Sequence, residues 1–152
     1  MVSNIFFFNC MGQDDATGKL ELSGITNDDI DLGWKQPVAQ QKLWQTVEDL
    51  LKHFCDSMGG HYLPLPTWQG LLGDKKLVIT HPLGGCPIGE THADGVANEF
   101  GQVFDASKPP DSKQVLDGLY VVDGAAIPGA LAANPSMTIA AQALKTVTKA
   151  LP

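Results

Sequence analysis

The chain has 152 residues, of which 43% are hydrophobic and 18% are charged, and its formal net charge is −7. These proportions are typical of a globular domain. The excess of negative charge disfavours a nucleic-acid-binding surface and, more weakly, a surface for anionic membranes. No apolar run approaches the ~20 residues of a membrane span. Composition therefore disfavours these classes of protein but indicates no particular function.

The cysteine pattern indicates a reducing compartment. Cys10, Cys55 and Cys86 are odd in number and widely spaced, and no Cys-x-x-Cys pair occurs. Reduced, buried thiols in a cytoplasmic protein are the expected state for such a pattern. The apolar residues 5–8 are too few for a signal peptide and lack a basic flank.

The first half of the chain predicts three strands and one helix. Residues 5–8 and 19–22 predict two strands around a polar turn, and residues 30–34 alternate as a third strand would. Pro37 is well placed to open a helix, and Gly59-Gly60 is expected to end it. The apolar residues of this helix recur at helical spacing and predict core packing rather than a cofactor contact: Leu43, Trp44, Val47, Leu50, Leu51, Phe54 and Met58.

The second half predicts shorter strands separated by loops. Residues 62–73 are expected to form an ordered loop, and residues 77–80 a short buried strand that leads to a histidine. Residues 102–105 predict another strand. Residues 119–122 have the nearly continuous apolar character of a strand that is covered on both faces.

The last predicted helix runs from about Pro135 to Ala150, with Asn134 as its N-cap. Asparagine favours the N-cap and proline the following position. A capped helix with no further role is one interpretation. The preceding residues 129–133 are small except for one leucine, so a large ligand could approach the backbone closely. A flat ligand that acquires negative charge would suit the N-terminus of this helix.

Two further positions are weak signals when each is taken alone. Asp123-Gly124 follows the predicted buried strand, where an acid commonly binds ligand hydroxyls, but the pair also fits an ordinary turn. His81 precedes a proline, which keeps its backbone extended, although a lone histidine is more often structural. A metal site from His81, Cys86 and His92 is disfavoured, because their spacing fits no standard zinc pattern. His92 is therefore given only a structural role, as is His53.

The three motif segments gain meaning in combination. They are residues 80–89 (THPLGGCPIG), 118–124 (GLYVVDG) and 134–141 (NPSMTIAA). Together they closely resemble the C-terminal signature of the glucose-methanol-choline (GMC) oxidoreductases, most of all the cholesterol-oxidase-like branch. The resemblance is strong over residues 77–149 and looser over residues 1–76.

The resemblance implies an FAD-dependent enzyme that oxidises an alcohol by hydride transfer to the flavin. It implies that His81 and Asn134 are the catalytic pair. It also implies that Asp123, Gly124, Asn134, Pro135 and Thr138 lie beside FAD. The physical chemistry is compatible, since an imidazole can take the hydroxyl proton and an amide can orient the substrate oxygen. The substrate would be a small-molecule alcohol, sterol-like or otherwise bulky.

The ADP half of FAD requires a strand, a Gly-x-Gly-x-x-Gly turn and a helix, and this sequence contains no such turn. We therefore expect a C-terminal portion of an enzyme whose N-terminal FAD-binding half is supplied elsewhere. The alternative is a non-catalytic remnant or interaction module. The predicted fold class is α/β, as an α+β fragment. Residues 1–76 would belong to an antiparallel substrate-domain sheet with a helix. Residues 77–152 would supply the last strand and helix of a Rossmann-like FAD-binding domain.

Overall fold

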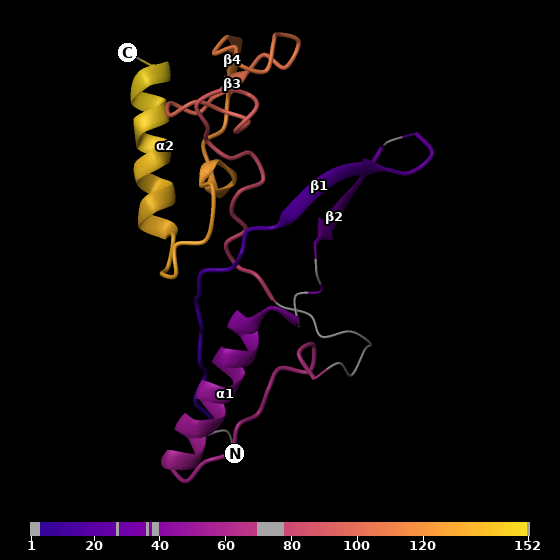
Figure 1. The fold of residues 1–152 in the computed structure, drawn as a ribbon. Helices are drawn as coiled ribbons and strands as arrows, with labels where there is room; N and C mark the ends of the chain where they lie inside the picture. Colours follow the sequence, from indigo (N-terminus) through magenta and orange to yellow (C-terminus); the bar gives the residue numbers. More distant parts are fainter. Residues whose placement is uncertain (1–3, 27, 36, 38–39, 70–77, 152) are drawn as a thin grey trace.

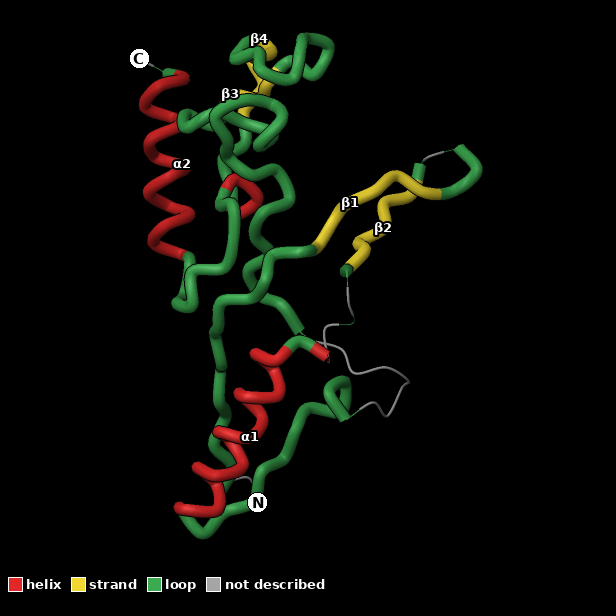
Figure 2. Tube along the Cα trace, viewed as in Figure 1, coloured by secondary structure: helices red, strands yellow, loops and turns green. Residues whose placement is uncertain are grey.

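The computed structural model describes residues 4–26, 28–35, 37, 40–69 and 78–151. Two antiparallel strand pairs and two long helices make it a small α+β structure, and most of the remaining chain is loop (Figures 1 and 2). The elements follow in the order β1 (Gly18–Ser23), β2 (Asp29–Trp34), α1 (Lys42–Ser57), β3 (Gln102–Phe104), β4 (Val115–Tyr120), the 3-10 helix η2 (Gly124–Ala126) and α2 (Ser136–Ala150).

The β1–β2 hairpin confirms the strands predicted at residues 19–22 and 30–34, and it projects from the rest of the chain (Figure 1). Leu20 lies opposite Leu32, and Leu22 lies opposite Ile30. Since side chains alternate along a strand, these four share one face of the hairpin. They remain 54–69% exposed. The alternation therefore produces an amphipathic hairpin whose apolar face is uncovered by the described residues.

Residues 5–8 form no strand, so that prediction is wrong. This segment instead runs along α1, where the Phe8 ring lies 5.3 Å from the Phe54 ring in an edge-to-face contact. Further along, Gly12 lies against Leu43, whose Cδ1 atom would be only 2.6 Å from an added Cβ. The phenylalanines thus pack against a helix rather than pairing with a neighbouring strand.

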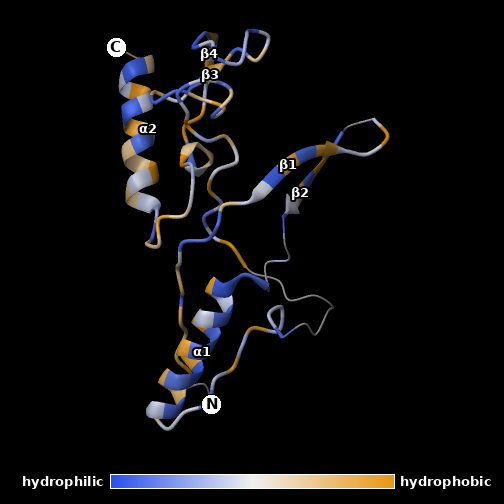
Figure 3. Cartoon of the chain, viewed as in Figure 1, coloured by the Kyte–Doolittle hydropathy of each residue, from blue (hydrophilic) through white to orange (hydrophobic). Residues whose placement is uncertain are grey.

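Helix α1 confirms the predicted helix but begins later than expected. A single turn joins Pro37 to Gln40, residues 38–39 lie outside the described residues, and the helix begins at Lys42. It ends as predicted, with Gly59 in the left-handed region at a φ of 69°. The expected core packing of its apolar stripe is wrong, because no residue of α1 is buried. The N-terminal segment covers that face only in part, so Leu50, Phe54 and Met58 remain 66%, 48% and 72% exposed. Figure 3 shows how hydropathy varies along the helix.

In the second half, β3 confirms the strand predicted at residues 102–105. Strand β4 shares Leu119 and Tyr120 with the strand predicted at residues 119–122, but it begins four residues earlier and ends two residues earlier. It pairs antiparallel with β3. Leu119 is 49% exposed, so the expectation of a strand covered on both faces is wrong. A two-stranded sheet leaves its strands open. Of the predicted strand at residues 77–80, position 77 lies outside the described residues. The rest is irregular and exposed, so that prediction is also wrong.

Most of the small core lies in the second half, where Ala97, Phe104, Ala126 and Ile127 are buried together with the Thr146 side chain of α2. Gly101 brings α2 close to β3. It has a φ of 73°, and an added Cβ would lie 2.5 Å from the Val121 carbonyl oxygen and 2.7 Å from Thr146 Oγ1. Only glycine fits such a left-handed position against main-chain atoms.

Two further predictions concern the thiols and the membrane. All three cysteines are free, but Cys10 is exposed and the other two are only half-buried, so the expectation of buried thiols is wrong. Neither helix in the described part of the chain has the length and apolar composition that crossing a membrane requires.

Candidate active site

The His81 turn and the Asp123-Gly124 turn, distant in sequence, are joined through their main chains. The Cys86 N–H donates to the Ala125 carbonyl at 3.0 Å, and the Ile88 N–H donates to the Ala126 carbonyl at 3.0 Å. A Cβ added at Gly124 would lie 3.0 Å from the Pro82 carbonyl oxygen and 3.2 Å from Ile139 Cδ1 of α2. Gly124 therefore lets three motif segments approach one another closely.

His81 is half-buried, and its Nδ1 lies 3.2 Å from the hydroxyl oxygen of Thr80. No hydrogen bond joins Nε2 to any described residue. The following Pro82 restricts the backbone of His81.

Asp123 lies just beyond β4 and caps η2, since its Oδ1 accepts a 2.9 Å hydrogen bond from the Ala125 N–H. The turn interpretation of Asp123-Gly124 therefore describes the local structure. The Asp123 side chain is exposed, and its second carboxylate oxygen has no hydrogen bond to a described residue.

The predicted N-cap is one residue off, because Pro135 is the N-cap of α2. Asn134 precedes it, and its Oδ1 accepts a 3.0 Å hydrogen bond from the Ser136 N–H. The first intrahelical bond runs from the Ile139 N–H to the Pro135 carbonyl. The N–H groups of Met137 and Thr138 consequently lack acceptors within the helix, at its positive end. The Asn134 and Thr138 side chains are exposed, whereas Pro135 is buried.

Ala132, just before Asn134, has a φ of 54°. The left-handed region costs a non-glycine residue roughly 1–2 kcal/mol, and strain of this kind gathers at ligand sites. The small residues predicted to admit a ligand therefore also have an unusual backbone.

A cleft of about 700 Å³ connects the motif segments with the first half of the chain. The motif side contributes Thr80, His81, residues 130–133 and Pro135. The other side comes from the N-terminal segment, α1 and the loop that follows it, and it is rich in aromatic and aliphatic residues: Phe6, Phe8, Trp44, Leu51, Leu63 and Trp68. His81 and the two neighbours of Asn134 thus line the same cleft, while the Asn134 side chain is not part of its lining.

Sequence reasoning missed the polar residues of this cleft. Glu48 lies 3.0 Å from Lys52 Nζ and accepts a 3.0 Å hydrogen bond from Trp68 Nε1. Burial raises the pKa of the Tyr62 hydroxyl above its ordinary value, and the negative charge of Glu48 adds to the rise. Trp44 Nε1 is buried and has no acceptor among the described residues. The spacing of Glu48 and Lys52, four residues apart on a helix, was the one available signal.

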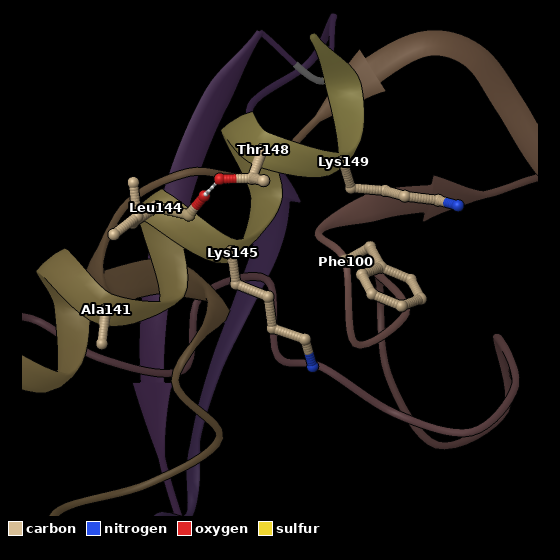
Figure 4. A pocket seen from close by; sticks show the side chains of 6 residues that line it. All are labelled: Phe100, Ala141, Leu144, Lys145, Thr148 and Lys149. Carbon is tan, nitrogen blue, oxygen red and sulfur yellow. Dashed lines mark hydrogen bonds between the residues drawn. The ribbon is translucent and has the colours of Figure 1, made fainter. Parts of the chain in front are cut away.

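A second hollow, of about 500 Å³, is lined by α2 and by Phe100 of the preceding loop (Figure 4). Its lining contains no predicted site residue. The Lys145 and Lys149 ammonium groups lie 5.0 and 5.4 Å from the centre of the Phe100 ring, and Lys145 also pairs with Glu99 at 2.7 Å. These side chains cover Phe100 and connect α2 to the preceding loop, which is a packing role.

The described residues contain no group of three or more potential ligands that could hold a metal ion. His92 Nε2 lies 2.9 Å from the carbonyl oxygens of Lys108 and Pro109, in agreement with the structural role assigned to it.

Comparison with known proteins identifies the family. The family model described as GMC oxidoreductase matches residues 14–143. Cholesterol oxidases of two Mycobacterium tuberculosis strains, CDC 1551 and H37Rv, are each 43% identical to the chain over 108 residues. Each alignment covers 57% of this chain and 17% of the relative, so the chain spans about a sixth of those proteins. No solved structure matches. The chain belongs to the GMC oxidoreductase family, as a cholesterol-oxidase-like C-terminal portion.

Proposed function

We propose that this chain is the catalytic C-terminal portion of an FAD-dependent alcohol oxidoreductase. One observation carries the proposal: His81 and the residues flanking Asn134 line a single cleft, although the two motifs are distant in sequence. A ligand in that cleft would meet an imidazole from one turn and the N-terminus of α2 from the other.

The residues around α2 fit the flavin of FAD. Residues 130–133 place only small side chains and one leucine at the cleft, so a flat ring system can approach the backbone. The N–H groups of Met137 and Thr138 are available at the positive end of the helix. Asp123, Gly124, Pro135 and Thr138 would lie beside the ring. When bound there, FAD would accept the hydride that leaves the alcohol carbon.

His81 would accept the hydroxyl proton as the hydride leaves, so that the alcohol loses two electrons and two hydrogens and becomes a carbonyl. General-base catalysis of this kind typically contributes 10²–10⁴-fold in rate. Asn134 does not itself line the cleft, and its Oδ1 accepts from the Ser136 N–H. Its Nδ2 group would therefore donate to a substrate oxygen that extends from the cleft to the start of α2. The bond to Ser136 would orient the amide before the substrate arrives.

The far side of the cleft supports a bulky apolar alcohol of sterol-like size. Its lining is mainly aromatic and aliphatic, and 700 Å³ falls within the ordinary range of small-molecule sites. Its polar side chains include His81 and Thr80 on the motif side and Glu48 and Tyr62 on the other. A large hydrocarbon body with one hydroxyl would match this distribution.

A GMC polypeptide carrying the Gly-x-Gly-x-x-Gly turn would be the partner that completes the FAD site. It would cover apolar surface such as the hairpin face and the outer face of α2, where Leu144 is 68% exposed. In the complete enzyme, residues 77–152 would supply the last strand and helix of a Rossmann-like domain, and residues 1–76 part of the substrate domain. The three free thiols favour a cytoplasmic location.

The direct test co-expresses this chain with the N-terminal half of a cholesterol-oxidase-like enzyme and records the flavin absorbance. We expect a yellow complex whose flavin is bleached by a sterol under anaerobic conditions. His81→Ala should slow the bleaching by about 10²-fold or more.

His53→Ala is the matched control, because His53 is exposed on α1 and does not line the cleft. It should bleach at the parental rate. Equal rates in the His81 and His53 variants would remove His81 from the mechanism. A complex that binds no flavin at all would favour a non-catalytic remnant.

A further inference from the structure

Thr80 and His81 are neighbours that both line the cleft, and they share a hydrogen bond. The Thr80 Oγ1 atom lies 3.2 Å from His81 Nδ1. This bond occupies one ring nitrogen and leaves Nε2 as the nitrogen available to a ligand. The backbone of the pair is restrained on its C-terminal side, where the Pro82 carbonyl lies against Gly124. The ring is therefore held through both its backbone and its side chain.

The direction of this bond decides what Nε2 can do. A neutral imidazole carries one N–H, and a threonine hydroxyl can either donate or accept. If the hydroxyl donates, Nδ1 is the bare nitrogen, Nε2 carries the proton, and no basic nitrogen remains for the cleft. If the hydroxyl accepts from an Nδ1–H group, Nε2 is bare and can receive a proton.

A hydrogen bond from His81 Nδ1–H to the Thr80 hydroxyl can also persist through the reaction. After Nε2 takes a proton both ring nitrogens are donors, and the Thr80 oxygen still accepts from Nδ1–H without reorienting. The bond then becomes charge-assisted, and bonds of this kind are about twice as strong as neutral ones. The hydroxyl would therefore favour the protonated ring that forms as the alcohol is oxidised.

We propose that Thr80 is a positioning residue that accepts a hydrogen bond from His81 Nδ1–H and holds Nε2 unprotonated toward the substrate. This inference rests on the proposed function of His81 as the base. Thr80 itself touches neither the substrate carbon nor the transferred hydride in this scheme.

The test measures the tautomer of His81 by ¹⁵N NMR of the histidine rings of the full chain at alkaline pH. The His81 signals are identified by their loss in His81→Ala. The parent should show the proton mainly on Nδ1. In Thr80→Val, which keeps the shape but lacks the hydroxyl, the ratio of the two tautomers should shift by about fivefold toward Nε2–H. Thr80→Ser should restore the parental ratio.

Thr148→Val is the matched control, because the Thr148 hydroxyl bonds only the Leu144 carbonyl of its own helix. It should leave the His81 tautomer unchanged. Equal ratios in the parent and Thr80→Val would overturn the inference, as would a parent with the proton mainly on Nε2.

Flavin reduction in the co-expressed complex separates this inference from the proposed function. Thr80→Val should lower kcat about fivefold with KM unchanged, and Thr80→Ser should recover it. If Thr80→Val shifts the tautomer while His81→Ala reduces flavin normally, the role of His81 fails and the hydrogen-bond assignment stands. If His81→Ala abolishes reduction while Thr80→Val leaves tautomer and kcat unchanged, only the Thr80 inference fails.

Discussion

The two halves of the described chain, residues 4–69 and residues 78–151, are stabilised by different kinds of contact. In the second half, main-chain hydrogen bonds such as Cys86 to Ala125 join distant turns, and apolar side chains such as Phe104 and Ile127 are buried. In the described first half, Trp68 is the single buried apolar residue. The β1–β2 hairpin and α1 instead present apolar faces to solvent. The candidate catalytic residues lie in the self-supporting half, and most of the cleft wall lies in the other.

This difference separates two requirements of an enzyme site. Reacting groups must stay within a fraction of an ångström of one geometry, which backbone contacts achieve well. A binding wall for an apolar ligand needs mainly surface, and surface of that kind is stable only when something covers it.

The largest expected effect is on the stability of the second half. Gly101→Ala combines a left-handed backbone with overlap of main-chain atoms, so it should lower the free energy of unfolding of this half by about 3 kcal/mol or more. Urea unfolding followed by amide exchange of residues 97–146 measures the loss. The tryptophans, which all lie in the first half, should report little change if the two halves are independent.

Gly118→Ala is the matched control, since Gly118 has a φ of 74° but nothing within 4 Å of an added Cβ. It should cost only about 1 kcal/mol of left-handed strain. Equal costs at the two positions would contradict the close approach of Gly101 to Thr146.

A smaller effect is expected in the first half. Leu22 is 68% exposed on the hairpin, so Leu22→Ala should change the unfolding free energy of the isolated chain by less than about 0.5 kcal/mol. In the co-expressed complex the same change should cost about 2–5 kcal/mol if the partner buries that face. A cost that stays small in the complex would mean that the partner leaves the hairpin face uncovered.

The smallest effect concerns pH. Burial, and to a lesser degree the charge of Glu48, raises the pKa of Tyr62 above its ordinary value of 10.0. The stability that protonated Tyr62 contributes to the folded state is therefore fully present below pH 10.0. The contribution is lost as the pH rises through the higher pKa of the folded state. NMR titration of the Tyr62 ring measures the shift. Glu48→Gln should lower the pKa partly, leaving the larger effect of burial. A Tyr62 pKa in the ordinary range would contradict the burial of this side chain and would indicate that water fills this part of the cleft.

Local patterns predicted the elements with strong local signals. The alternation in β1 and β2, the spacing in α1 and the Asn134-Pro135 start of α2 all depend on near neighbours. Each element exists, although the N-cap of α2 is Pro135 rather than Asn134. The errors arise where a pattern predicts burial, because burial depends on whether another part of the chain covers the element. The stripe of α1 and the apolar run near Leu119 were expected to be buried, and the described chain covers each of them only in part.

The site residues were proposed from motif resemblance, and their roles remain predictions. What the motifs could not predict is the contact between turns, because the approach of Gly124 to Pro82 depends on tertiary structure. Nor could they predict that Glu48, Tyr62 and Trp68 would meet in one cleft, since each side chain is ordinary in its local sequence.

The Pro82 carbonyl lies against Gly124, and the three atoms nearest to a Cβ added there belong to Pro82, Ile139 and Leu83. None of these residues is part of the aromatic wall of the cleft. Substitutions that reshape the aromatic wall would therefore alter which alcohol fits while the spacing between the imidazole turn and the acid turn stays constant. New substrate preferences could then evolve on one side of the cleft without rebuilding the chemistry on the other.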